Sequence, residues 1–334
     1  MQSLLPQRRA HGNRAPVPGA RTSSSPPAPA PRRRWRPLLA AALTTALLAM
    51  AAAPAYAQGA WLTLASMPTA REDLAGATAP CPGALNRTCV YAIGGDNSTG
   101  DLSTVEAYNP ATGMWATLPS MPTARQAPAG ATAPCPTGVG GLAGTCVYAI
   151  GGFNSSGDLS TVEAYSPVTG MWAALRSMPT ARDGLAGATA PCPGALNRTC
   201  VYAIGGENLS GFLSTVEAYS PVTGMWAAPR SMPTARAGLA GATAPCPTGV
   251  GGPGGTCVYA IGGFNSSGDL STVEAYTPAA DTWAALPSMS TARERLAGAT
   301  APCPGALNRT CVYAIGGSNG SGELSTVEAF AVGR

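Results

Sequence analysis

Ten cysteines carry the clearest chemistry in this 334-residue sequence, because they come in five closely spaced pairs. The pairs are Cys81/Cys89, Cys135/Cys146, Cys192/Cys200, Cys246/Cys257 and Cys303/Cys311. An even number at regular spacing predicts disulfide bonds, and we expect each bond to form within its pair. A zinc site needs four ligands, and His11 is the only histidine of the chain. We therefore expect no metal and no cofactor.

One arginine and one glutamate also recur at fixed places along the chain. They are Arg71, Arg125, Arg182, Arg236 and Arg293, and Glu106, Glu163, Glu217, Glu274 and Glu328. Five exposed arginines would form a cationic ring for an acidic ligand. Alternatively, each arginine pairs with a glutamate or with loop carbonyl groups as part of a copied structure. One residue of each kind per copy favours the structural role.

Two short motifs match enzyme signatures, but their surroundings do not fit an enzyme site. Residues 249–254 fit GxGxxG, yet they lie between two paired cysteines with no helix expected after them. Residues 316–320 fit GxSxG, yet the chain after residue 57 has no histidine to activate Ser318. We predict no catalytic residue, and the sequence leans against an enzyme.

The elements that must position these residues follow from an internal repeat. Tryptophans recur at alternating steps of 54 and 57 residues, and five double glycines keep the same steps. The tryptophans are Trp61, Trp115, Trp172, Trp226 and Trp283. In the first copy, residues 74–79, 89–93, 103–108 and 114–118 have the pattern of short strands separated by turns. Four short strands per copy are typical of one propeller blade.

The order of Gly94-Gly95, Tyr108, Trp115 and the segment 121–125 (MPTAR) resembles the kelch repeat. The resemblance covers residues 61–330 five times. It implies an all-β fold, a β-propeller of five four-stranded blades with the first strand of each blade innermost. Some kelch-type propellers are copper oxidases, but a copper site needs histidine ligands, which the chain after residue 57 lacks.

The repeats also predict how the ring closes. They span roughly residues 68–121, 122–178, 179–232, 233–289 and 290–334, within a propeller domain at 58–334. The last repeat has no tryptophan strand, whereas residues 61–67 have that strand's sequence ahead of the first complete repeat. We expect residues 61–67 to pair with the last blade and so to remove two open sheet edges.

Residues 1–57 are expected to be a signal peptide, because a basic, Pro- and Ser-rich region precedes an uncharged run at 37–53 and small residues up to Ala57. The run is short for an uncleaved membrane anchor, which is the alternative. We expect a secreted, extracellular or cell-envelope monomer, beginning at Gln58, from a GC-rich bacterium. This segment holds eight arginines and no acid, which leaves 12 arginines against 16 acidic residues. That balance argues against nucleic acid as a partner.

Five Asn-x-Ser/Thr sequences follow the double glycines, at Asn97, Asn154, Asn208, Asn265 and Asn319. They could carry glycans, or the asparagines could shape a turn. Their repeated position after Gly-Gly favours the turn.

Two loops differ among the otherwise copied repeats, and they predict the ligand face. One follows the recurring arginine and the other follows the glycine pair. The candidate residues are Glu72, Asp73, Asp96, Phe153, Asp183, Glu207, Phe264, Glu294 and Ser318. The kelch resemblance implies that both loops emerge on one side of the disc. We expect a binding or scaffold module for a protein or surface glycan; an extracellular enzyme or a structural cell-envelope protein is the alternative.

Overall fold

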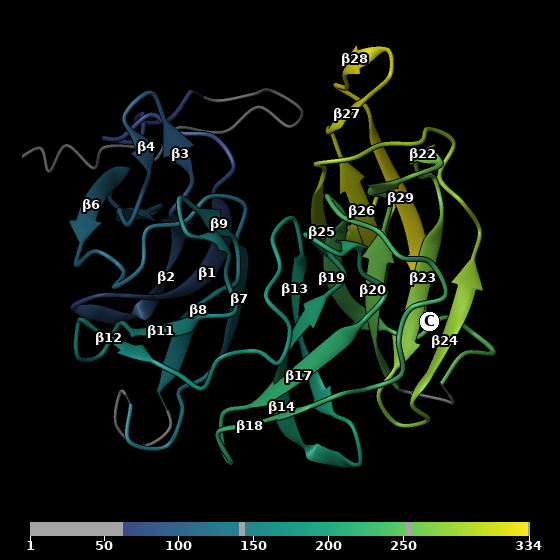
Figure 1. Cartoon of the computed structure of the whole chain (residues 1–334), viewed down its shortest axis with the longest axis horizontal. Coiled ribbons are helices and arrows are strands. Elements are labelled where there is room, and N and C mark those ends of the chain that lie inside the picture. The colour runs from purple at the N-terminus through teal and green to yellow at the C-terminus, as the bar shows by residue number, and fades with distance from the viewer. Residues whose placement is uncertain (1–62, 140–143, 252–254, 333–334) are drawn as a thin grey trace, which may run out of the picture. The chain divides into compact units, whose positions relative to one another are not determined.

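The computed structural model describes residues 63–139, 144–251 and 255–332, and these residues form strands and no helix. The predicted all-β class is therefore confirmed. Five antiparallel sheets follow one another along the chain as blades 1 to 5 (Figure 1). None of the described segments is a helix long and apolar enough to cross a membrane.

Blades 1 to 4 each have four strands, paired in chain order. Blade 1 consists of β1 (Ala75–Cys81), β2 (Ala84–Ile93), β5 (Val105–Asn109) and β6 (Met114–Leu118). Blade 2 consists of β7 (Ala129–Pro134), β8 (Thr145–Ile150), β11 (Val162–Ser166) and β12 (Met171–Ala174). Blade 3 consists of β13 (Ala186–Cys192), β14 (Ala195–Ile204), β17 (Val216–Ser220) and β18 (Met225–Ala227). Blade 4 consists of β19 (Ala240–Pro245), β20 (Thr256–Ile261), β23 (Val273–Thr277) and β24 (Thr282–Leu286).

Blade 5 has three strands, β25 (Ala297–Cys303), β26 (Ala306–Ile315) and β29 (Val327–Val332). In every blade a small hairpin joins the second strand to the third, and each of its two strands is two residues long. The hairpins are β3 (Asp96–Asn97) with β4 (Gly100–Asp101), β9 (Phe153–Asn154) with β10 (Gly157–Asp158), β15 (Glu207–Asn208) with β16 (Gly211–Phe212), β21 (Phe264–Asn265) with β22 (Gly268–Asp269), and β27 (Ser318–Asn319) with β28 (Gly322–Glu323).

The innermost strands are made of small residues because their backbones approach one another closely. A Cβ at Gly130 of β7 would lie 2.6 Å from the carbonyl oxygen of Gly76 in β1. The same approach holds between Gly187 and Gly130, and between Gly241 and Gly187. A side chain at any of these positions would push neighbouring blades apart, which explains the repeated Ala-Gly-Ala-Thr-Ala sequence.

Tryptophan side chains of blades 2 to 4 pack against the preceding blade. Trp172 of blade 2 packs in the apolar cluster of blade 1, 5.4 Å from Tyr165 between ring centroids. Its indole N–H donates to the carbonyl oxygen of Pro119 at 2.8 Å. Trp226 and Trp283 repeat this contact one and two blades further on. The core therefore lies between blades as much as within them.

The recurring arginines and glutamates form buried ion pairs, one inside each blade. The pairs are Arg71–Glu106, Arg125–Glu163, Arg182–Glu217, Arg236–Glu274 and Arg293–Glu328. All five arginine side chains are fully buried. Each arginine thus pairs with a glutamate, as the structural interpretation expects, and its buried side chain is not available for an exposed cationic ring.

All five predicted disulfide pairs are present: Cys81–Cys89, Cys135–Cys146, Cys192–Cys200, Cys246–Cys257 and Cys303–Cys311. Each bond links the end of a blade's first strand to its second strand. It closes a short loop at the end of the blade where this hairpin turns.

The predicted closing strand falls partly outside the described residues. Trp61 and Leu62 are not described, and Thr63–Met67 belong to no strand. Within the described chain, β29 pairs with β26 alone. The carbonyl oxygen of Ala65 accepts a hydrogen bond from the Trp115 indole at 2.8 Å, as Pro119 O does from Trp172. The pairing of residues 61–67 with blade 5 stays a prediction.

Replacing Arg182 with Ala should destabilise the propeller by about 3–5 kcal/mol. The change leaves the Glu217 carboxylate buried without its partner and removes donors from two loop carbonyl groups. Chemical denaturation measures the free energy of unfolding, with the exposed Arg198→Ala as the matched control. A loss below 1 kcal/mol would show that the pair does not hold the blade.

Replacing Cys81 and Cys89 together with Ser should lower stability by about 2.5–3 kcal/mol, because the unfolded chain regains the freedom of a short loop. Denaturation of both proteins under non-reducing conditions gives the difference. Peptide mapping of the unaltered protein is the control, and a bond between blades in that map would contradict the pairing.

Candidate ligand-binding face

The two divergent loops of each blade are joined by backbone hydrogen bonds. In blade 1 the N–H of Glu72 donates to Asp96 O, and the N–H of Asp96 donates to Glu72 O, both at 3.0 Å. The same isolated bridge links Gln126 to Phe153, Asp183 to Glu207, Ala237 to Phe264, and Glu294 to Ser318. Because β1 begins where β2 ends, both loops lie at one end of the blade. The expectation that they emerge on the same side is confirmed.

A chain of hydrogen bonds connects these loops from blade to blade. The N–H of Ala127 donates to Asp73 O at 2.8 Å, Gly184 N–H to Ala127 O at 3.2 Å, and Gly238 N–H to Gly184 O at 2.8 Å. Arg295 N–H then donates to Gly238 O at 2.7 Å. All five residues have φ between 46° and 58°. This left-handed backbone is strained for Asp, Ala and Arg. The hydrogen bonds between neighbouring blades hold these residues in that conformation.

A cavity of about 420 Å³ opens where these loops meet. Five of the predicted residues line it, namely Asp73, Phe153, Asp183, Glu207 and Phe264. Gln126, Arg295 and four leucines also line it, and the leucines are Leu74, Leu185, Leu239 and Leu296. The other candidates, Glu72, Asp96, Glu294 and Ser318, do not line the cavity.

The cavity carries an acidic group with a shifted pKa. Partial burial raises the pKa of Asp183 to about 6, and the negative charges of Glu207 and Asp158 add to the rise. The pKa of Glu207 is raised as well, by burial and by Asp158, although Arg295 opposes the shift. Ionising these carboxylates therefore costs free energy in the folded protein, and a bound cation would reduce that cost.

Aromatic rings lie beside the acids. Phe153 is 38% exposed. Phe264 meets Phe212 edge to face, with ring centroids 5.3 Å apart. A flat apolar surface next to carboxylates suits a ligand with both a hydrophobic part and a positive charge.

Sequence comparison missed Gln126, Arg295, Asp158 and Phe212 as site residues. Gln126 and Arg295 lie in the divergent loop that follows the recurring arginine, but they are not among the predicted ligand-face residues. Asp158 and Phe212 occupy one position of the two-residue hairpin, which reads Asp101, Asp158, Phe212, Asp269 and Glu323 from blade to blade. Comparing the repeats at this position would have identified a third divergent site.

The five asparagines after the glycine pairs shape turns. The side-chain amide of Asn154 donates to Ala124 O at 3.0 Å, and its side-chain oxygen accepts from Ser156 N–H at 2.8 Å. The other four asparagines donate to the equivalent alanine carbonyl groups. Across the described residues, no three His, Cys, Asp or Glu side chains are grouped so that they could hold a metal ion.

Comparisons with known proteins agree with the blade architecture. The Kelch motif family matches residues 77–122, 141–179, 188–233 and 253–290. Kelch-like protein terF of Aspergillus terreus is 30% identical over 234 residues, covering 62% of this chain and 45% of that protein. Kelch-like protein 36 of Bos taurus is 31% identical over 145 residues, covering 41% and 21%. Kelch-like protein 35 of Mus musculus is 29% identical over 146 residues, covering 42% and 22%.

The chain spans less than half the length of each of these curated relatives. The matched ranges cover half of the sequence, and their elements are those of the blades described above. The chain therefore belongs to the Kelch motif family.

Proposed function

We propose that this chain is a secreted binding module that takes a basic segment of a protein partner at the cavity between its divergent loops. Kelch propellers generally bind proteins. Secretion rests on the signal peptide expected at residues 1–57, which lie outside the described residues. The observation that carries the ligand class is the cavity itself, which combines acidic side chains with exposed phenylalanine.

The balance of charge favours a cationic ligand. Asp73, Asp183 and Glu207 line the cavity against a single positive side chain, Arg295. An arginine of the partner would relieve the repulsion among the carboxylates and lay its guanidinium against Phe153 or Phe264. The four lining leucines would pack against the partner's apolar side chains.

A surface glycan is a second candidate, because the exposed ring of Phe153 beside carboxylates also suits the apolar face of a sugar. A peptide array that varies arginine content, screened beside a glycan array with residues 58–334, separates the two ligands. Binding of arginine-containing peptides that weakens with added salt supports the proposal. Binding to glycans alone would favour the second candidate.

Replacing Phe153 and Phe264 together with Ala should weaken capture of the best arginine peptide by at least about tenfold, because the rings supply the contact surface. The melting temperature should change little, since Phe153 is exposed and Phe264 is half-buried. Leu85→Ala, at the opposite end of blade 1, is the matched control. Unchanged capture by the double variant would place the site elsewhere.

Peptide binding should also depend on Asp183 and on pH. Its pKa in the folded protein, about 6, lies above the ordinary value of 3.8, so the carboxylate is charged at pH 7.5 and neutral at pH 5. If a bound cation restores the ordinary pKa, affinity should fall by up to about tenfold between these pH values. Asp183→Asn should remove that dependence. A variant with the same pH profile as the unaltered protein would contradict the assignment.

Asp183→Asn should also change the stability of the protein in the absence of any ligand. A raised pKa means that the folded state binds the proton more tightly than the unfolded chain, so stability falls as the pH rises from about 3.8 to about 6 and stays at the lower level above that. Asp183→Asn should therefore raise the melting temperature at pH 7.5 and leave it nearly unchanged at pH 4. The exposed Glu323→Gln, which lies in a hairpin, serves as the control.

A further inference from the structure

The two ends of the blades differ in charge. The disulfide end comprises the loops that the five disulfides close and the turns between third and fourth strands. These segments contain three arginines and one acidic residue, namely Arg87, Arg198, Arg309 and Asp281. Apart from Asp281 and the five buried glutamates, all acidic residues, ten of the 16, lie in the loops and small hairpins of the opposite end. The disulfide end is therefore basic, and the opposite end is acidic.

The disulfide ends of neighbouring blades lie side by side. The hydroxyl of Thr132 in blade 2 donates to Thr78 O in blade 1, and the hydroxyl of Thr189 in blade 3 donates to Thr132 O, both at 2.9 Å. These bonds align the first strands at equivalent positions. The hydroxyl of Thr137, in the disulfide loop of blade 2, also donates to Val222 O in the turn of blade 3 at 3.3 Å. The loops and turns of blades 1 to 3 therefore form one surface.

Large apolar side chains are exposed on this surface. They belong to the disulfide loops, to the turns between third and fourth strands, and to the first residue of the fourth strand. Turns are usually built from Gly, Pro, Asn, Asp and Ser, and exposed apolar side chains that gather on one surface mark an interaction site. Six of them, each between 48% and 66% exposed, are Leu85, Leu196, Val168, Val222, Met171 and Met225.

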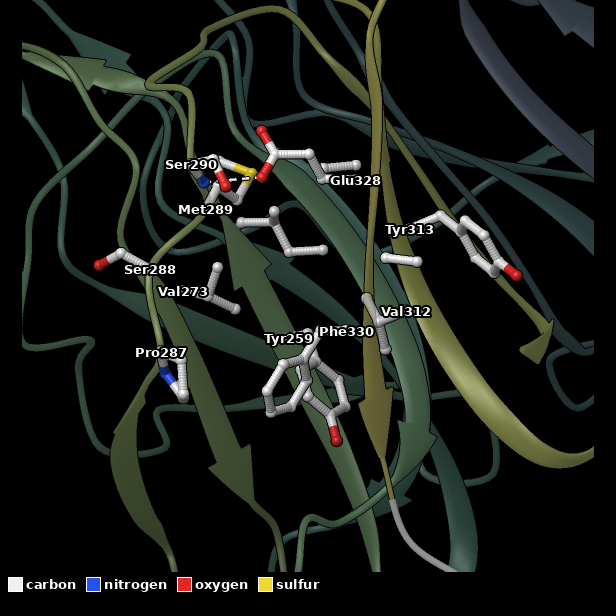
Figure 2. A pocket seen from close by; sticks show the side chains of 13 residues that line it. Tyr259, Val273, Pro287, Ser288, Met289, Ser290, Val312, Tyr313, Glu328 and Phe330 are labelled. Carbon is white, nitrogen blue, oxygen red and sulfur yellow. Dashed lines mark hydrogen bonds between the residues drawn. The ribbon is translucent and has the colours of Figure 1, made fainter. Parts of the chain in front are cut away.

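Apolar side chains between the blades are enclosed instead. Val273 and Val312 are buried and line a cavity of about 200 Å³ between blades 4 and 5. Figure 2 shows these two side chains on different sides of the cavity, with Glu328 above them. The Glu328 carboxylate accepts a hydrogen bond from Ser290 N–H at 2.6 Å. The apolar groups at the disulfide end are therefore not part of the packing between blades.

The arginines of the disulfide end can meet an external anion. Arg87, Arg198 and Arg309 are exposed, and none of them forms an ion pair within the part of the chain that the structure describes. Arg176, which follows the fourth strand of blade 2, adds a further positive charge beside the apolar groups. Its guanidinium lies 3.2 Å from Met225 Sδ. Positive and apolar side chains are thus mixed on one surface.

This mixture distinguishes between two anionic partners. A second copy of the chain offers carboxylates at its opposite end, but in the described small hairpins of that end only Phe153 and Leu209 are exposed large apolar side chains. A second copy would therefore match the arginines and leave most of the apolar side chains in water. The surface of an anionic bilayer supplies phosphate groups and an apolar layer beneath them, so it matches both.

We propose that the disulfide end docks on an anionic phospholipid surface. The leucines and valines of its loops and turns enter the apolar layer beneath the headgroups, and Arg87, Arg198 and Arg309 bind the lipid phosphates. The acidic end then faces away from the bilayer, so the cavity with Asp183 stays open to solution. Docking does not depend on what that cavity binds.

Cosedimentation with vesicles tests the proposal. The protein used is residues 58–334, which contain every described strand and leave out the eight arginines of residues 1–57. It should bind vesicles of phosphatidylglycerol and phosphatidylcholine in equal parts, and added salt should weaken the binding. Leu85→Ser with Leu196→Ser should weaken binding by at least about tenfold, because the apolar contact is lost. Leu209→Ser is the matched control, since Leu209 is exposed at the opposite end, and it should bind like the unaltered protein.

Two further variants keep the test decisive. Replacing Arg87, Arg198 and Arg309 together with Gln should weaken binding by at least about tenfold and remove most of its salt dependence. If the leucine variant folds poorly, Val168→Ser with Val222→Ser measures the apolar contact independently and should weaken binding too. Melting temperatures show whether each variant is folded.

Three results would overturn the proposal. The protein could fail to bind the mixed vesicles. The leucine and valine variants could bind them as well as the unaltered protein, which would make the surface a site for any polyanion. Light scattering could show chains that associate without vesicles and separate in the arginine variant, which would place a second copy at this end. Phe153→Ala with Phe264→Ala should bind vesicles normally, so failure of the ligand site and failure of membrane docking are distinguishable.

Discussion

The buried arginine of each blade is the interaction on which the rest of the propeller depends. The backbone of Arg182 bonds to blade 2, through its N–H to Leu159 O and its carbonyl oxygen to Gly152 N–H. Its side chain reaches into blade 3, where it donates to Gly205 O and Thr215 O and pairs with Glu217. One residue therefore fixes the position of two blades. A buried guanidinium tolerates this arrangement only because the carboxylate and carbonyl groups around it are in place.

This constraint explains why the blades are copied so closely and why their loops are not. Each copy must supply the arginine, its glutamate, the glycine pair and the inner glycine at fixed positions, because a change in one blade disturbs the next. The side chain of the residue after the arginine can vary, since only the backbone of that residue forms the bridge to the opposite loop. Side chains there vary from Gln126 to Asp183 to Ala237 while the geometry stays constant. A rigid frame with variable side chains at one end is a suitable arrangement for a binding surface.

Much of this architecture could be predicted from the sequence because it is repeated. The disulfide pairs, the structural role of Arg182 and its counterparts, and the meeting of the two divergent loops all follow from comparing copies. The pKa of Asp183 could not be predicted, because it depends on burial and on Asp158 from another blade. Phe212 was missed for a similar reason, since its significance comes from its contact with Phe264 of the next blade. Spacing along one repeat does not reveal such contacts between blades.

The closing segment shows where reasoning from the repeat stops. The fourth-strand sequence at residues 61–67 indicates which strand edge it completes, but its pairing with β29 and the expectation of a monomer stay predictions, because Trp61 and Leu62 lie outside the described residues. The contact of Ala65 O with the Trp115 indole is the one that Pro119 O makes with Trp172, so the segment meets blade 1 as a fourth strand of a preceding blade would. Backbone contacts such as that of Gly130 on Gly76 O fix the angle between neighbouring blades. The small residues of the innermost strands therefore set how far around the ring five blades extend.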